Sequence, residues 1–206
     1  MAAIHNQAGT DFLEVNPDGS ININLAGIAA IDIGGSAVSS SNPLPVGGKS
    51  VQKSASFTRP ADTTTYAAND AIADSTSVPT LLSFANCANA NAGQGYIVKT
   101  RLMTNQKTCT ARFRLSFYHT APSPVNDNAP KPMLYANKDK LIGRIDLDPC
   151  TTEDTTSDAA YVLSTTLLPY VCAAADTTIY CILTTLDAFT PASAQQFYLE
   201  ITCELS

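Results

Sequence analysis

Residues 109–119 read CTARFRLSFYH, and apolar side chains occupy alternate positions along this stretch. Alternate residues of an extended strand point to opposite faces, so the pattern predicts a strand with one face against a core. Residues 195–205, QQFYLEITCEL, show the same alternation. The two apolar rows are Cys109, Ala111, Phe113, Leu115 and Phe117 in the first stretch, and Phe197, Leu199, Ile201 and Cys203 in the second.

This period of two recurs from Lys49 to the end of the chain, with polar or proline-bearing turns between the strands. Helical periodicity is scarce, and only residues 85–93 have room for a turn or two of helix. The pattern predicts an all-β fold, an antiparallel β-sandwich whose most economical form is a jelly roll. The predicted strands are residues 51–57, 65–73, 80–84, 95–104, 109–119, 138–147, 159–172 (as one strand or two), 177–186 and 195–205.

The first part of the chain differs in composition from the rest. We expect residues 1–48 to form an extended N-terminal arm that anchors a β-sandwich domain at 49–206. Residues 16–19, NPDG, favour a tight turn and predict a β-hairpin, because proline presets φ and glycine accepts a left-handed backbone. Residues 34–49, GGSAVSSSNPLPVGGK, have the glycine, serine and proline content of a linker.

An alternating apolar row follows the predicted turn of the arm and consists of Ile21, Ile23 and Leu25. Such a segment can add a strand to the exposed sheet edge of a neighbouring protein through main-chain hydrogen bonds. We therefore name these three residues as candidates for an interaction. A hairpin packed on its own domain and a disordered arm are the alternatives.

Six cysteines are scattered along the chain without a CxxC motif, so their pairing does not follow from the sequence. Three of them continue apolar faces of predicted strands and are expected to be buried free thiols, which behave as small hydrophobic groups: Cys109, Cys181 and Cys203. The other three fall at the ends of predicted elements and are the candidates for disulfide bridges, including bridges between subunits: Cys87, Cys150 and Cys172.

Residues 57–77, FTRPADTTTYAANDAIADSTS, predict a strand–turn–strand corner. Arg59 is expected to pair with Asp62 or Asp70 across this corner. Two roles remain open for it. The corner is either plain scaffold, or it contacts a neighbouring subunit through Arg59, Asp62 and Tyr66.

The triplet Asp-Thr-Thr occurs three times, at 62–64, 154–156 and 176–178. An aspartate side chain can accept a hydrogen bond from the backbone two residues later, which closes an Asx-turn. Threonine then favours entry into a strand. We expect three similar turns and no true repeat, because the spacing between the triplets is unequal.

The charge content argues against two classes of partner. Charged residues make up 15% of the chain and the net charge is −6, with no cluster of Lys or Arg. Nucleic acids and anionic membrane surfaces both need clustered cations, so neither is expected as a partner. The longest apolar stretch, residues 25–35, is interrupted by Asp32 and is too short to span a bilayer.

The sequence contains no recognisable catalytic constellation, and we expect no catalytic residue, cofactor or metal. The two histidines are His5 in the arm and His119 at a strand end, and no GxSxG, HExxH or phosphate loop is present. Asp146, Asp148 and the acidic loop 126–128 lack the ligand spacing of a Ca²⁺ site, so solvated carboxylates are expected.

Several blocks together resemble a family of tailed-bacteriophage structural proteins that carry a TRPADTTxYAxxD-like block followed by strands and a loop like DNAP. Asn69 stands where the family pattern has glycine, and both residues suit a left-handed backbone. The blocks are TRPADTTTYAANDAIADST (58–76), GYIVKTRLMTNQ (95–106), ARFRLSFYHTAPSPVNDNAP (111–130) and NKDKLIGRIDL (137–147), and VNPDGSININ (15–24) also looks like phage virion sequence.

The resemblance implies a virion component. The predicted function is a non-enzymatic capsid decoration or cement protein that is made in the host cytoplasm, docks on the major capsid protein at the capsid surface and stabilises the head. Self-assembly as a homotrimer is expected by analogy. The alternative is a tail- or fibre-associated carbohydrate-binding module for host recognition. Its candidate sugar-stacking residues are Tyr118, Tyr135, Tyr161 and Tyr170.

Overall fold

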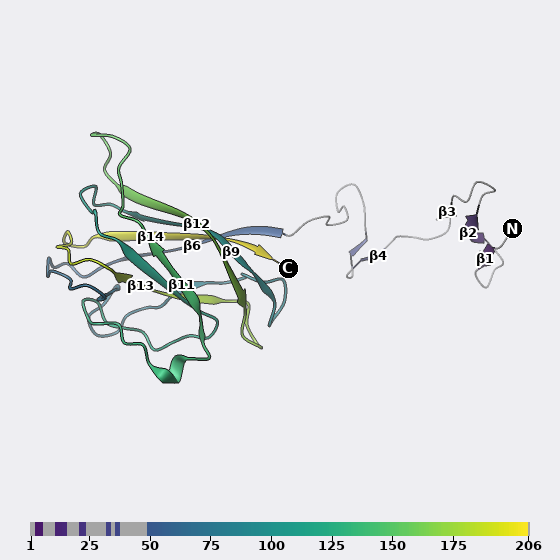
Figure 1. Cartoon of the computed structure of the whole chain (residues 1–206), viewed down its shortest axis with the longest axis horizontal. Coiled ribbons are helices and arrows are strands. Elements are labelled where there is room, and N and C mark those ends of the chain that lie inside the picture. Colours follow the sequence, from purple (N-terminus) through teal and green to yellow (C-terminus); the bar gives the residue numbers. More distant parts are fainter. Residues whose placement is uncertain are drawn as a thin grey trace. The chain divides into compact units, whose positions relative to one another are not determined.

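The computed structural model describes residues 49–205 in full, and it describes the backbone of five short strands within residues 1–48 (Figure 1). The chain divides into two units, Met1–Val46 and Gly47–Ser206, and each is described by itself. The described residues contain no α-helix, and their one helical element is the short 3₁₀ helix η1 (Tyr135–Asn137). In the described part of the chain, no helix has the length and apolar character needed to cross a membrane.

The first unit contains two small antiparallel sheets. β1, β2 and β3 form one sheet in that order, and β4 pairs with β5. β2 and β3 are the arms of a hairpin, and the turn sequence at 16–19 lies between them in the chain. The strands are β1 (Ala3–His5), β2 (Asp11–Val15), β3 (Ile21–Ile23), β4 (Asp32–Ile33) and β5 (Ser36–Ala37).

The second unit is an antiparallel β-sandwich, as the alternating pattern predicts. The predicted strand at 65–73 is much shorter than expected. Asn69 adopts a φ of 72° and the Ala67 N–H bonds to the Asp70 carboxylate, so the chain turns before pairing resumes. The strands are β6 (Lys49–Thr58), β7 (Ala71–Ile72), β8 (Leu82–Phe84), β9 (Gln94–Thr104), β10 (Phe113–Tyr118), β11 (Leu141–Leu147), β12 (Ala160–Val171), β13 (Ile179–Thr185) and β14 (Gln196–Leu205).

The strand order identifies the sandwich as a jelly roll. One sheet has the order β12-β9-β14-β6, and the other has β11-β10-β13-β7 with β8 also paired to β13. Pairing of β6 with β14, β7 and β8 with β13, β9 with β12, and β10 with β11 makes one long antiparallel ribbon. This ribbon is rolled so that β14 also pairs with β9, and β13 with β10. Folding of a paired ribbon into two facing sheets is the jelly-roll connectivity.

The core lies between the sheets and is formed by the alternating residues that the sequence places on one face. Phe113, Leu115 and Phe117 of β10 are completely buried, and Phe197 of β14 meets Phe113 edge-on at 5.9 Å between ring centroids. Burial of each such side chain stabilises the fold by roughly 2–3 kcal/mol. These contacts tie the centres of the two sheets together.

A second, smaller apolar cluster covers part of the outer face of the β10–β13 sheet. Tyr118 and Ile182 point away from the main core, and Val125 from the loop after β10 packs on them. The residues that connect β10 to β11 therefore lie over this face. The outer face of the other sheet has no comparable covering segment within the described residues.

All three Asp-Thr-Thr triplets form the Asx-turns that the sequence predicts. In each turn the aspartate Oδ1 accepts the backbone N–H of the second threonine. Hydrogen bonds from this threonine lower the pKa of each carboxyl, chiefly through the backbone N–H at Asp62 and chiefly through the threonine hydroxyl at Asp154 and Asp176. The bonds are Thr64 N–H to Asp62 (2.9 Å), Thr156 N–H to Asp154 (2.7 Å) and Thr178 N–H to Asp176 (3.0 Å).

Gly95 is the position where the sandwich is least tolerant of a side chain. A Cβ there would lie 2.6 Å from Tyr170 Oη and even closer to the Glu204 carbonyl oxygen. Tyr170 Oη donates to the Cys87 carbonyl, so Gly95→Ala should break this buried bond and lower the free energy of unfolding by about 1–3 kcal/mol. The control is Gly143→Ala, whose Cβ would meet only the flexible end of Leu168 at 2.7 Å. Equal urea midpoints for both variants would contradict this assignment.

The Asx-turns also predict a dependence of stability on acid. A carboxyl whose pKa is lower in the folded state stabilises the fold above its unfolded pKa of about 3.9, and this contribution is lost as the pH falls through the folded value. Thermal unfolding midpoints should therefore be steady near neutral pH and fall below about pH 4. The double variant Asp154→Asn/Asp176→Asn keeps the turn acceptors without the titration, so its midpoint should fall less steeply over the same acid range.

Candidate interaction site

Arg59 is the centre of the corner that the sequence predicts as a contact site. Its guanidinium pairs with Asp62 at 3.1 Å, so the Arg59–Asp62 pair is found and the Arg59–Asp70 pair is not. The second ion pair is with Asp127, at 3.2 Å. Arg59 Nε donates to Tyr66 Oη at 2.9 Å, and Nη1 donates to the Asp62 carbonyl at 2.6 Å. Every nitrogen of the guanidinium has an acceptor.

Tyr66 and Asp127, the other members of this cluster, are also fixed by hydrogen bonds and packing. Tyr66 Oη donates to Asp127 Oδ1 at 2.5 Å, and the Ala73 N–H donates to the same oxygen at 2.9 Å. The Tyr66 ring stacks on Phe189 with 5.0 Å between centroids. Burial raises the pKa of Tyr66 well above its ordinary value, and the hydrogen bond to Asp127 raises it further. Tyr66 is therefore a neutral donor at physiological pH.

This geometry corrects the hypothesis that Arg59 and Tyr66 contact a neighbouring subunit. Their exposed fractions are 2% and 0%, so neither side chain reaches the surface. Only Asp62, with a side chain 38% exposed, is accessible. Arg59 and Tyr66 are therefore scaffold, and a contact through Asp62 stays a prediction. Asp127 belongs to the loop 126–128, whose carboxylate was expected to be solvated, and that expectation was wrong because Asp127 is buried against Arg59.

The arm residues remain untested as an anchor. Ile21 and Ile23 lie in β3, where their backbones are opposite Val15 and Leu13 of β2. Leu25 lies outside the described residues. The interaction predicted for these three residues stays a prediction.

The structure corrects the expectation of disulfides. All six cysteines are free and buried, including the three candidates Cys87, Cys150 and Cys172. Burial raises the pKa of Cys150 to about 12 and that of Cys172 to about 11. Burial keeps these three thiols away from the surface, so they are poorly placed to bridge to another subunit. The element ends at which they lie are folded inward.

The four candidate sugar-stacking tyrosines differ in how exposed their rings are. Tyr118 and Tyr170 are each 3% exposed and cannot present a ring face to a ligand. Tyr135 is 82% exposed on η1, and the Lys138 ammonium lies 4.9 Å from its ring centroid. Tyr161 donates its hydroxyl to the carboxylate of Glu153.

His119 and Asp146, which were considered as catalytic or metal-binding groups, are bonded to other residues of the fold. His119 bonds through Nε2 to the Asp139 carbonyl and through Nδ1 to the Thr120 hydroxyl. Asp146 is paired with Arg114. No group of three or more His, Cys, Asp or Glu residues within the described ranges is arranged to hold a metal ion.

An exposed apolar patch, which we call the β12 patch, lies on the outer side of the β12–β9 pair. β12 contains no charged residue over its whole length. Cross-strand register places Leu163 opposite Arg101 and Val171 opposite Gln94. The patch consists of Tyr96 (40% exposed), Leu163 (47%), Leu167 (67%) and Val171 (54%).

A bulge in β12 contributes to this exposure. The register with β9 shifts between Thr165 and Leu168, so Leu167 is not held in the regular ladder. The sequence left open whether residues 159–172 form one strand or two, and they form one bulged strand, Ala160–Val171. The patch was not predicted, although Leu163 and Leu167 alternate with more buried neighbours.

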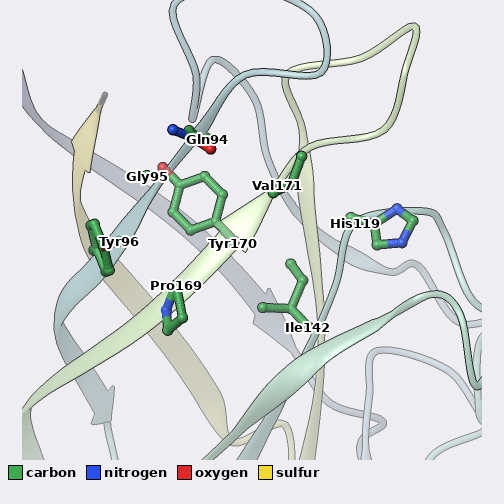
Figure 2. A pocket seen from close by; sticks show the side chains of 8 residues that line it. All are labelled: Gln94, Gly95, Tyr96, His119, Ile142, Pro169, Tyr170 and Val171. Carbon is green, nitrogen blue, oxygen red and sulfur yellow. The ribbon is translucent and has the colours of Figure 1, made fainter.

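A hollow of about 300 Å³ adjoins the β12 patch. Figure 2 shows Tyr96 and Pro169 on one side of Tyr170, and Ile142 and His119 on the other. Gln94, Gly95 and Val171 complete the lining. The volume falls at the lower end of the range for small-ligand sites. The hollow and the β12 patch together form the candidate interaction site.

Comparison with known protein families finds no matching family, and comparison with curated proteins finds no similar sequence.

Substitution of Arg59 tests whether this residue stabilises the fold or contacts a neighbouring subunit. Arg59→Ala leaves Asp127 as an uncompensated buried charge, so the free energy of unfolding should fall by about 3–5 kcal/mol. The matched control is Arg112→Ala, which removes an exposed pair with Asp187 and should change stability little. Denaturant unfolding measures both. A fully stable Arg59→Ala protein that fails to assemble would restore the contact role.

Proposed function

We propose that this chain is a non-enzymatic structural protein of a bacteriophage virion. It acts as a decoration or cement protein that docks on the assembled head through the major capsid protein and stabilises the shell. We expect it to self-associate as a trimer at the capsid surface. The resemblance of residues 50 to 205 to phage structural proteins and the jelly-roll fold support this proposal.

The observation that carries the proposal is the β12 patch. Four large apolar side chains are exposed on one strand pair of a rigid sandwich, and β12 adds no charge to them. Exposed apolar patches rimmed by polar residues mark interaction surfaces when they are large. Jelly rolls are common among viral capsid and lectin domains, but a fold alone does not define a function.

The N-terminal segment supplies a second means of attachment. It enters the sandwich at Lys49, the first residue of β6, and β6 is an edge strand of its sheet. A tether of this length allows the apolar row of the arm to pair with a neighbouring sheet edge while the sandwich rests on the shell. Two linked contacts bind more tightly than either one alone.

Carbohydrate binding is the second candidate, and the hollow in Figure 2 favours it. Tyr96 offers a partly exposed ring, and Gln94 brings a polar group to the same hollow. Sugar sites combine an aromatic surface with a few polar groups in this way. In this reading the protein contributes to host recognition from the tail or a fibre.

Binding to shells that lack the protein tests the proposal. Deletion of residues 2–48 should abolish co-sedimentation with shells of the major capsid protein and leave the circular dichroism of the sandwich unchanged. Leu163→Asp/Leu167→Asp should weaken binding by about tenfold or more, because a charge replaces a buried apolar contact. Val78→Asp is the control, since Val78 is 81% exposed and lies outside the patch.

Two results would contradict docking on the head. Undiminished binding of both the deletion and the patch variant would remove the proposed surfaces. Absence of shell binding by the intact chain, together with saturable retention on immobilised glycans that Tyr96→Ala abolishes, would establish the carbohydrate-binding alternative.

A further inference from the structure

A small polar hollow lies on the outer face of the β11-β10-β13 sheet, far along the chain from the β12 patch. We call it the basic hollow. Its volume is about 200 Å³. Register places Arg114 opposite both Asp146 and Thr184, and Arg144 opposite Ser116. The lining consists of Asn69, Arg114, Lys131, Met133, Arg144 and Thr184.

The folding of three separate segments brings three cations to this hollow. Arg114 comes from β10, Arg144 from β11, and Lys131 from the loop before η1. The chain as a whole has 18 acidic and 12 basic side chains, so a local excess of cations is not expected from composition. Like charges at close range destabilise one another unless an anion lies between them.

Only one of the three cations is neutralised by a close carboxylate. Asp146 accepts both Nε and Nη2 of Arg114, at 2.6 and 2.7 Å. Arg144 forms no ion pair with any described residue. Asp146 lies two residues along β11 from Arg144, but it forms its ion pair with Arg114. The five N–H groups of Arg144 are therefore available for a planar acceptor.

Lys131 is not an ordinary solvated surface lysine. Its side chain is partly buried and its ammonium lies 5.7 Å from the centroid of the Tyr118 ring. Its backbone N–H donates to the Asn69 carbonyl at 3.1 Å, which fixes the loop at the rim of the hollow. Burial lowers the pKa of Lys131, and the neighbouring charge of Arg144 lowers it further. A negative group in the hollow would relieve this repulsion.

Ser116 lies next to the basic hollow, although it does not line it. It is completely buried on the same outer face, opposite Arg144 in register. Its hydroxyl has no hydrogen-bond partner among the described residues. Buried hydroxyls normally have a partner, because an unpaired one costs about 1–3 kcal/mol.

We propose that the basic hollow binds one oxyanion, a sulfate, phosphate or carboxylate group, either as the free ion or as the charged substituent of a saccharide. Arg144 donates two parallel hydrogen bonds to two oxygens of the group, and Lys131 contributes a single positive charge. The hollow is too small for a polymer and is lined mainly by polar groups, so it recognises a single charged group. Met133 lines it, and the next residues, Leu134 and Tyr135, are exposed apolar side chains.

This inference does not depend on the proposed function, because it concerns the isolated chain. Titration of the ¹⁵N-labelled protein at pH 7 with sodium sulfate, sodium phosphate or sodium glucuronate tests it, with sodium chloride at equal ionic strength as the reference. Amide shifts of residues 69, 131, 133, 144 and 184 should saturate, with dissociation constants of about 1 mM, a value typical of a small charged ligand. Chloride should produce no saturable shift at these residues.

Variants locate the site. Arg144→Gln should weaken binding about tenfold or more, and Lys131→Gln should weaken it less, because a bidentate partner contributes more than a point charge. Lys49→Gln is the matched control, an exposed lysine on β6 that removes the same charge elsewhere. Preserved dispersion of the amide spectrum shows that each variant is folded.

The outcomes are distinct. Tighter binding of glucuronate than of the inorganic ions, with shifts that extend to residues 134 and 135, identifies a saccharide as the source of the charge. Equal binding of all three identifies the free oxyanion. Shifts that never saturate, or an affinity that Lys49→Gln lowers as much as Arg144→Gln, would overturn the proposal.

Discussion

A single buried cation, the guanidinium of Arg59, connects loops that belong to different parts of the chain. It links the end of β6 to the corner at Asp62, to Asp127 in the loop between β10 and β11, and to the Ala192 carbonyl at 3.3 Å. A buried charge is tolerated only where its donors are satisfied, so other arrangements of these loops are penalised. The cluster holds together the segments that surround one end of the jelly roll.

The two sheets of the sandwich present chemically different outer faces. The β12–β9 side carries exposed apolar groups beside Arg101, whereas the β10–β11 side carries the basic hollow and a covering loop. Strand alternation permits this separation, because one face of every strand is committed to the core and the other is free to vary. The proposed docking surface and the proposed anion site can thus coexist on one scaffold without sharing a residue.

Much of the fold can be predicted from the sequence, because its strands and turns depend on residues that are close together in the chain. Alternation predicts the strands around Phe113 and Phe197, and the Asp-Thr-Thr triplets predict their turns, because both depend on neighbours a few residues apart. The Arg59–Asp127 pair spans 68 residues and depends on how loops meet in space. Burial of Cys87 and Cys172 likewise depends on tertiary packing. An exposed row on β12 looks the same in sequence as a buried one, so the patch could not be recognised.

The burial of all six thiols determines how the protein can be labelled chemically. The exterior of the described part of the chain is inert toward maleimides and other sulfhydryl reagents, although the protein is rich in cysteine. A cysteine introduced at an exposed position such as Val78 would be a unique attachment point for a dye, a spin label or a crosslinker. Neighbours of the protein in any assembly can then be mapped without replacement of the native buried cysteines.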